Sequence, residues 1–155
     1  MSHAAEGRWG SGGVEIFDVR LLDEQGEATH VFHTGEAVAL RFKVRTDRPV
    51  HDFVFGVALF NAEGVCVYGT NTDIEEYEAD TLSGDAEVTL AIEALDLVEG
   101  TYKLDVAAHK QDGAPYDYHR LLHTFRVKSR LKDVGVYRPR HHWSFAGPVK
   151  FKIKA

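Results

Sequence analysis

The stretch VALRFKVR, residues 38–45, decides the fold class of this chain. Apolar side chains occupy positions 38, 40, 42 and 44, and basic side chains occupy positions 41, 43 and 45. A period of two residues places successive side chains on opposite faces of an extended chain. The stretch therefore predicts a β-strand with one face in a hydrophobic core and the other in water.

The segments on either side of this stretch have the same character. The further expected strands are residues 14–18, 53–60, 65–68, 88–92, 102–108, 116–127 and 149–153. Residues 53–60 are apolar on both faces, which is typical of a central strand covered on each side. Glycine-containing turns separate the strands, and residues 72–85 form a long acidic loop. The pattern predicts an all-β fold, an immunoglobulin-like antiparallel β-sandwich.

A local signature supports this fold. The pattern Leu95-x-Leu97-x-x-Gly100-x-Tyr102 resembles the tyrosine corner of immunoglobulin-like sandwiches. In that corner, the hydroxyl of a tyrosine near the start of a strand bonds to backbone a few residues upstream. An ordinary core tyrosine after a glycine turn is the alternative.

Length and composition are those of one domain. The chain has 155 residues with 44% hydrophobic residues, enough for one core. We expect residues 1–12 to be a flexible linker and residues 13–155 to be a single β-sandwich. No apolar stretch is long enough to span a membrane, and residues 1–13 lack the apolar segment of a signal peptide. One cysteine, Cys66, rules out an internal disulfide and fits a reducing compartment.

The charge of the chain is distributed unevenly. Residues 126–155 contain nine basic residues and one acidic residue, whereas the preceding 125 residues contain nine basic and 23 acidic residues. A basic end can indicate a nucleic-acid tail, docking on an acidic body, or unrelated solvated faces. Nucleic acid is disfavoured as a partner because no binding motif accompanies the strand-like spacing of the basic residues.

The sequence gives no positive sign of catalysis. Nine histidines occur without the spacing of a metal site, and neither a nucleophile elbow nor a phosphate-binding loop is present. The sequence therefore predicts no catalytic residue, no metal and no cofactor. A pair of distant carboxylates acting on a glycoside stays open, because only the folded chain would bring them together.

Polar aromatic residues gather at three places. Aromatic rings stack on the C–H faces of sugars, while amides, carboxylates and imidazoles bond the hydroxyls, so these places are candidates for carbohydrate binding. Packing at the ends of strands is the alternative interpretation, above all for Trp143. The candidate residues are Tyr68, Asn71, Tyr116, Asp117, Tyr118, His119, His142 and Trp143.

Several of these segments resemble one known family. The stretches FHTGE (residues 32–36), VFGVALFNAEG (residues 54–64) and VYGTNT (residues 67–72) are similar to the C-terminal domain of Wzt. The opening RWGSGGVEI (residues 8–16) and the late Gly135 and Trp143 also resemble that pattern. Wzt is the ATPase subunit of the ABC transporter that exports O-antigen polysaccharide. The resemblance covers almost the whole chain.

The resemblance implies a function. It implies a non-catalytic domain that binds the export-ready O-antigen, with ATP hydrolysis in a separate domain absent from this chain. It also implies a location at the inner face of the cytoplasmic membrane, beside the ATPase and membrane subunits of the transporter. Dimers that exchange a C-terminal strand occur in the family, which makes Val149, Phe151 and Ile153 candidate exchange residues. A purely structural dimerisation domain without glycan contact is the alternative, and an accessory domain of a polysaccharide enzyme is a weaker one.

Overall fold

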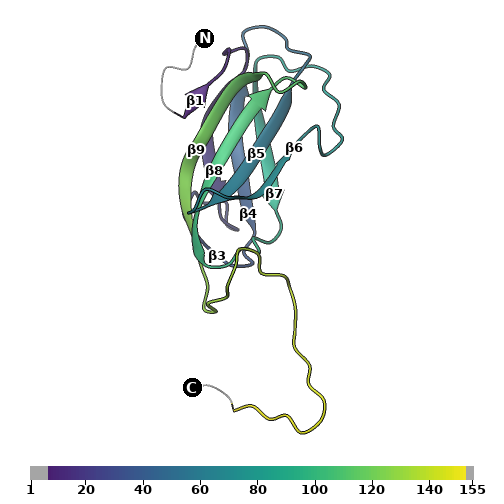
Figure 1. Cartoon of the computed structure of the whole chain (residues 1–155). Helices are drawn as coiled ribbons and strands as arrows, with labels where there is room; N and C mark the ends of the chain where they lie inside the picture. Colours follow the sequence, from purple (N-terminus) through teal and green to yellow (C-terminus); the bar gives the residue numbers. More distant parts are fainter. Residues whose placement is uncertain (1–6, 153–155) are drawn as a thin grey trace.

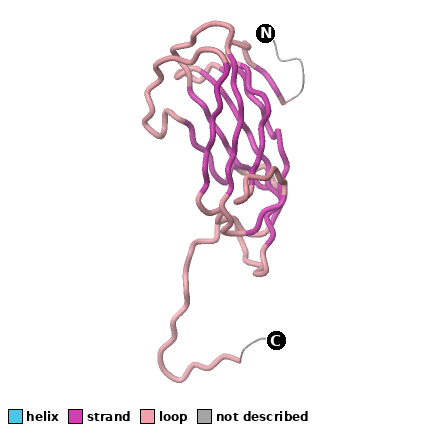
Figure 2. Tube along the Cα trace, turned by 180° about the vertical axis from the view of Figure 1, so that it is seen from behind, coloured by secondary structure: helices cyan, strands magenta, loops and turns pink. Residues whose placement is uncertain are grey.

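The computed structural model describes residues 7–152, and these residues form nine strands in two layers (Figures 1 and 2). The strands are β1 (Arg8–Trp9), β2 (Glu15–Leu22), β3 (Val31–His33), β4 (Val38–Arg45), β5 (Val54–Asn61), β6 (Cys66–Asn71), β7 (Asp85–Ile92), β8 (Gly100–His109) and β9 (Pro115–Lys128).

The two layers differ in size. The large sheet has the order β1-β9-β8-β5-β6, and β3 pairs in parallel with the far end of β9. The small sheet has the order β2-β4-β7 and is antiparallel throughout. All other pairings in the large sheet are antiparallel. The predicted immunoglobulin-like β-sandwich is therefore confirmed.

The core lies between the two sheets. Residues 38, 40, 42 and 44 of β4 are at most 4% exposed, as the alternation of this stretch predicts. They face the large sheet, where Leu104 and Val106 of β8 are fully buried. Burial of such side chains contributes about 25 cal/mol per Å² of apolar surface and provides the main stabilisation of the sandwich.

The predicted tyrosine corner is present. The hydroxyl of Tyr102 on β8 donates a hydrogen bond of 2.7 Å to the carbonyl oxygen of Val98, four residues upstream. Tyr102 is 3% exposed, and its ring stacks with Phe125 of β9 at a centroid distance of 5.8 Å. The corner therefore ties the loop before β8 to the core.

Strand β5 differs from the expectation in one respect. Its inward side chains Phe55, Val57 and Leu59 pack against the core, but no second layer covers the outward positions Gly56 and Ala58. The sandwich has only two layers, so the outer face of β5 meets solvent. Residues with little or no side chain occupy these outward positions, and they leave a depression described below.

The region before β2 also differs from the expectation. Of residues 1–12, which we expected to form a linker, the described residues 7–12 run along β9. Arg8 and Trp9 pair with His119 and Tyr118 and form strand β1. This short segment is therefore part of the large sheet.

The basic C-terminal segment docks in part on its own acidic body. Lys132 lies 2.6 Å from Glu99, and Arg140 lies 3.3 Å from Asp96. The amide of Val98 donates a bond of 2.7 Å to the carbonyl of residue 136. One of the expectations from the charge distribution, docking on an acidic body, thus holds for the first part of this segment.

The remainder of the C-terminal segment extends away from the sandwich (Figures 1 and 2). Residues 149–152, expected to begin a final strand, form no strand in this chain, and Ile153 lies outside the described residues. A strand needs a neighbouring edge to satisfy its backbone, and the segment has none within reach here. The expected exchange of this segment between two copies stays a prediction.

Candidate functional site

A row of small and polar residues crosses the outer face of the large sheet. Ala107 of β8 points outward, because its neighbours at positions 106 and 108 are fully buried in the core. Residues paired directly across an antiparallel ladder share a face. The strand registers therefore place one outward row across five strands: Asn71, Gly56, Ala107, Tyr118 and Trp9.

All members of this row except Trp9 line a groove of about 230 Å³. The floor consists of positions without bulky side chains, namely Gly56, Ala58, Gly69 and Ala107. Glycine in the interior of a strand often marks a place where another molecule approaches the backbone. Other groove-lining residues stand around this floor: Asn71, Ile74, Asp105, His109 and Tyr118.

Tyr118 is held firmly in its place beside the groove. Its hydroxyl donates a bond of 2.5 Å to Oδ2 of Asp105, and Oδ1 of Asp105 accepts a bond of 2.7 Å from the amide of Leu121. Burial raises the pKa of Tyr118, and the hydrogen bond to the Asp105 carboxylate raises it further. The phenol is therefore neutral at physiological pH, and its ring keeps one orientation.

Trp9 packs against this aromatic ring. Its ring stacks on Tyr118 at a centroid distance of 4.6 Å and an interplanar angle of 13°. This stacking covers the face of Tyr118 that points away from the small-residue floor and supports the ring from that side. Polar groups of Asn71 and His109 lie on the same face. The groove thus combines a flat aromatic wall with hydrogen-bonding groups.

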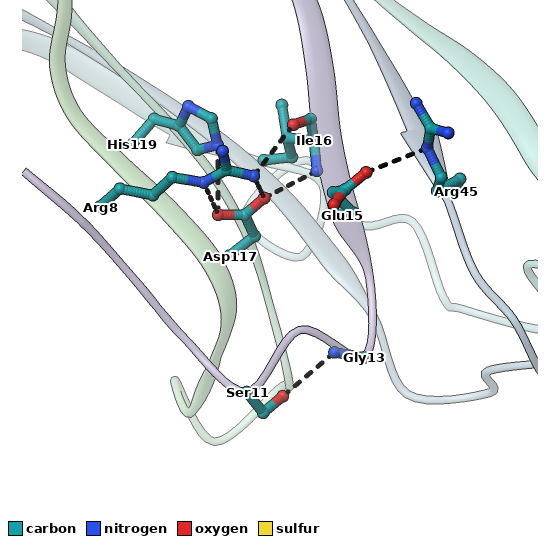
Figure 3. A network of polar contacts seen from close by, with 8 residues as sticks. All are labelled: Arg8, Ser11, Gly13, Glu15, Ile16, Arg45, Asp117 and His119. Atoms are coloured by element: carbon teal, nitrogen blue, oxygen red, sulfur yellow. Dashed lines mark hydrogen bonds and ion pairs between the residues drawn. The ribbon is translucent and has the colours of Figure 1, made fainter. Parts of the chain in front are cut away.

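A buried carboxylate on the other face of β9 anchors the N-terminal segment (Figure 3). Asp117 is 1% exposed, and its two oxygens lie 3.0 Å and 2.9 Å from Nε and one terminal nitrogen of Arg8. Its Oδ2 also accepts a bond of 2.8 Å from the amide of Ile16, and Nε2 of His119 lies 3.1 Å from Oδ1. We call this group of four residues the clasp.

The clasp keeps Asp117 ionised. Burial alone would raise the pKa of its carboxyl, but His119, Arg8 and the Ile16 amide outweigh burial and lower that pKa to about 2. The clasp therefore stays intact across the physiological pH range. It ties β1 and β2 to β9, because Asp117 lies 109 residues beyond Arg8 and 101 residues beyond Ile16.

A second concavity lies between the sheets at their open edge. This cavity of about 410 Å³ has walls of core side chains, including Phe42, Phe55 and Leu90. At its rim, Thr70 donates a bond of 3.0 Å to Glu75, so these two polar side chains already have partners. Thr70 and Asn71 line both this cavity and the groove.

The outer face of the small sheet is different again. Its charged side chains pair with one another: Arg45 with Glu15 at 3.0 Å, Lys43 with Asp18 at 3.4 Å and Arg41 with Glu87 at 3.5 Å. Pairs of this kind are solvated and contribute little to stability. This face has no counterpart to the aromatic wall of the groove.

The structure brings two of the predicted site residues together. Asn71 and Tyr118 line the same groove, although they lie on strands at opposite sides of the sheet. Tyr68 lies on the same strand as Asn71 and is 53% exposed, but its register partner is the core-facing Leu59. Tyr68 therefore points away from the groove.

The other predicted residues lie elsewhere. Asp117 and His119 belong to the clasp, and Tyr116 is 8% exposed with its hydroxyl bonded to the carbonyl of Asp52 at 2.7 Å. His142 and Trp143 lie in the extended C-terminal segment, where the Trp143 ring stacks with Phe145. None of these five residues lines the groove.

Several groove residues were not expected from the sequence. Asp105 and His109 carry no motif, and Trp9, which stacks on Tyr118 beside the groove, fell in a range expected to be a linker. The small residues at positions 56, 58 and 69 did carry a signal, because alternate small residues in an apolar strand mark an uncovered face. Cys66, the free thiol, is exposed near this floor: a Cβ added at Gly69 would lie 3.7 Å from its Sγ.

Two kinds of feature are absent from the part of the chain that the structure describes. Residues 7–152 contain no group of three or more His, Cys, Asp or Glu side chains that could hold a metal ion. No helix that could cross a membrane occurs in the same range.

The fold and the groove define the class of protein, an immunoglobulin-like β-sandwich with an open groove on its larger sheet. The chain belongs to the Wzt C-terminal domain family, which it matches over residues 5–139. This confirms the resemblance seen in the sequence.

Known proteins with a similar sequence or a similar fold support this assignment. The chain is 31% identical over 132 residues to the O-antigen export system ATP-binding protein RfbB of Myxococcus xanthus, and the match covers 85% of the chain but 29% of that protein. The crystal structure of the C-terminal domain of Wzt has the same fold, with a TM-score of 0.83 at 20% identity. That match covers 94% of this chain and 91% of the solved one.

Proposed function

We propose that the chain is a non-catalytic carbohydrate-binding domain that recognises O-antigen polysaccharide for export. The observation that carries this proposal is the groove, in which the ring of Tyr118, stacked on Trp9 behind it, stands beside a floor of glycine and alanine. The name of the relative RfbB, an O-antigen export ATP-binding protein, supports the choice of ligand.

The chemistry of the groove suits a sugar. A pyranose ring has flat C–H faces that pack on aromatic rings, and its edge carries hydroxyls that need polar partners. The Asn71 side chain can donate through Nδ2, while its Oδ1 already accepts a bond of 2.7 Å from the Ile74 amide. The imidazole of His109 bonds to the Lys110 carbonyl through Nδ1, which leaves Nε2 as a second polar group. The backbone at Gly56 and Gly69 is accessible, so a sugar edge can approach the floor closely.

Substitutions that fill the floor test this proposal. A Cβ at Gly56 would meet Asn71 at 3.4 Å, and one at Gly69 would meet Ala58 at 3.5 Å; both are distances that the fold tolerates. Neither glycine has a positive φ. The double variant Gly56→Ala/Gly69→Ala should therefore fold at least as well as the parent, because alanine restricts the unfolded chain more than glycine. Affinity for O-polysaccharide should fall at least about tenfold, since added methyl groups occupy the ligand's place.

The measurement is isothermal titration with O-polysaccharide from the strain that encodes this chain. Gly100→Ala serves as the control, because it also adds a methyl to a strand glycine but lies outside the groove, with its nearest contact at 3.5 Å. Equal affinity of the double variant and the control would contradict the groove as the binding site. An absence of binding by the parent would favour the alternative, a purely structural dimerisation domain.

The proposed setting is the transporter. The chain spans 29% of the length of RfbB, so nucleotide hydrolysis would belong to another part of such a protein. We therefore propose partners that include the ATPase and membrane subunits of an ABC exporter, at the inner face of the cytoplasmic membrane, and no nucleic acid.

The proposal includes a homodimer joined by the C-terminal segment. Phe145, Val149 and Phe151 are between 47% and 71% exposed in the isolated chain, and lysines at positions 150 and 152 would face the acidic body of a second copy. Deleting residues 147–155 should convert the dimer to a monomer in multi-angle light scattering, because it removes exposed apolar side chains. An unchanged oligomer after this deletion would refute the role of the segment.

A further inference from the structure

Strand β1 contributes one residue to the clasp and one residue beside the groove. Its two residues point to opposite faces of the large sheet, as neighbours on a strand do. Trp9 lies on the outer face and stacks on Tyr118 of the groove. Arg8 points to the inner face and pairs with Asp117 (Figure 3). The same two residues therefore connect the groove with the interior of the sandwich.

The backbone attachment of this strand is short. Around β1, the amide of Arg120 donates to Gly7 at 2.6 Å, that of Gly12 donates to Tyr116 at 2.8 Å and that of Ser11 donates to Pro115 at 3.2 Å. A two-residue strand at the edge of a sheet buries little apolar surface, and such segments open locally at a small free-energy cost. The clasp and the ring stack are therefore a large part of what holds β1 in place.

Close packing limits where this strand can sit. Gly10 has φ of 142°, and a Cβ there would lie 2.3 Å from the carbonyl oxygen of Tyr116. The backbone of the segment thus approaches β9 more closely than any other residue type allows. Consequently, Trp9 has one docked position, and it reaches the Tyr118 ring only when the segment lies against β9.

We propose that β1 is a ligand-coupled strap: Arg8 and Asp117 are positioning residues that hold Trp9 against Tyr118, and occupancy of the groove stabilises the docked strap. This inference rests on the proposed binding function. Trp9 stacks on the side of Tyr118 away from the floor, so a ligand that packs on Tyr118 meets a ring supported by Trp9 only in the docked state. Such a ligand binds the docked state better than the undocked state and shifts the equilibrium toward docking. Linkage makes the effect reciprocal, and loosening the strap weakens binding by the same factor.

The coupling has a directional consequence. The strap begins at Gly7, whose carbonyl accepts the bond from the Arg120 amide, so the docking of this end depends on whether the groove is occupied. A contact that holds or displaces Gly7 would in turn alter affinity in the groove, because the two equilibria share the strap. The strap therefore relays occupancy of the groove to the N-terminal side of the domain.

Trp9 itself provides the first readout. The chain has two tryptophans, so the variant Trp143→Phe leaves Trp9 as the single tryptophan reporter. In this background, Arg8→Gln should increase quenching of Trp9 by acrylamide without any ligand, because the strap undocks more often. Arg8→Lys, which keeps a charge near Asp117, should give a smaller increase. Arg45→Gln is the matched control, since Arg45 also pairs with a carboxylate but lies on the small sheet.

Binding provides the second readout. O-polysaccharide from the encoding strain should bind Arg8→Gln at least about fivefold more weakly than Arg45→Gln, a typical coupling between linked sites. In the parent, the polysaccharide should slow hydrogen exchange of the Gly12 and Arg120 amides by a similar factor. Thermal unfolding verifies that each variant is folded, and Arg8→Lys replaces Arg8→Gln if the latter is not.

The outcomes separate the two proposals. If Trp9 quenching is unchanged in both Arg8 variants, the strap proposal is wrong. It is also wrong if quenching increases but the Arg8 variants bind the polysaccharide as tightly as the Arg45→Gln control. Ligand-independent exchange at Gly12 and Arg120 overturns the coupling while leaving the binding function intact. Absence of polysaccharide binding by the parent overturns the proposed function, and with it the coupling that rests on it.

Discussion

The substitution Asp117→Ala is expected to lower the free energy of unfolding by about 3 kcal/mol. The carboxylate is 1% exposed and accepts bonds from Arg8 and from the Ile16 amide. Its removal leaves a buried amide without an acceptor and a guanidinium without a counter-charge. Because the Arg8 side chain is 40% exposed, water can solvate part of it, which keeps the loss near the lower end for buried pairs.

Urea denaturation measures this loss against a matched control. Glu15→Ala breaks the pair with Arg45, whose side chains are 50% and 47% exposed, and should cost less than about 0.5 kcal/mol. Asp117 and Glu15 lie close together in the fold (Figure 3). The main difference between the two substitutions is therefore how deeply the removed carboxylate is buried. Equal losses in the two variants would show that the clasp contributes no more than a surface pair.

The same carboxylate gives the stability a defined pH dependence. Its pKa is about 2 in the folded chain, below the ordinary aspartate value of 3.8, so the unfolded state takes up the proton first as pH falls. The contribution of Asp117 is therefore complete above pH 3.8 and disappears as pH falls through about 2. The difference in unfolding free energy between the parent and Asp117→Asn should be constant above about pH 5 and shrink toward pH 2. A constant difference over the whole range would contradict this assignment.

The substitution Tyr118→Ala is expected to reduce affinity for O-polysaccharide about thirtyfold, the loss typical of a central aromatic residue in an interface. It removes the ring on which Trp9 stacks and the hydroxyl that Asp105 holds. Tyr118→Phe keeps the ring and should lose much less, because only the bond to Asp105 is missing. Titration with the polysaccharide gives both values.

Tyr68→Ala is the control for this prediction. Tyr68 is 53% exposed and was an equal candidate from the sequence, but its register partner Leu59 faces the core. The variant should bind with unchanged affinity. A large loss in Tyr68→Ala with none in Tyr118→Ala would move the binding site to the open edge between the sheets, beside the cavity lined by Phe42 and Phe55.

Much of the fold was predictable from local patterns. The alternation of apolar residues in 38–45 predicts a strand, and the glycine turns predict hairpins. Both features are predictable because they depend on residues that are close together in the sequence. The tyrosine corner was predictable for the same reason, since Tyr102 and Val98 are four residues apart. The expected final strand at residues 149–153 had the right alternation, but alternation alone does not supply a neighbouring edge.

The site was less accessible to prediction. Counting back by twos from the core residues Phe125 and Val127 puts Asp117 and His119 on the inner face and Tyr118 on the outer face, so the sequence did hold a hint. The partner of Asp117 could not be predicted from sequence spacing, because Arg8 lies 109 residues away. Trp9 was missed for the same reason: its place beside Tyr118 exists only once β1 has joined the sheet.

The single thiol of the chain allows ligand binding in the groove to be followed by labelling. Cys66 is exposed on the edge strand β6, and its Sγ would lie 3.7 Å from a Cβ on Gly69 in the groove floor. A maleimide dye would therefore attach at a single place, at the margin of the groove, without any engineered cysteine. Such a dye would sense the polarity of its surroundings, so arrival of a saccharide could be followed in real time on an otherwise unaltered chain.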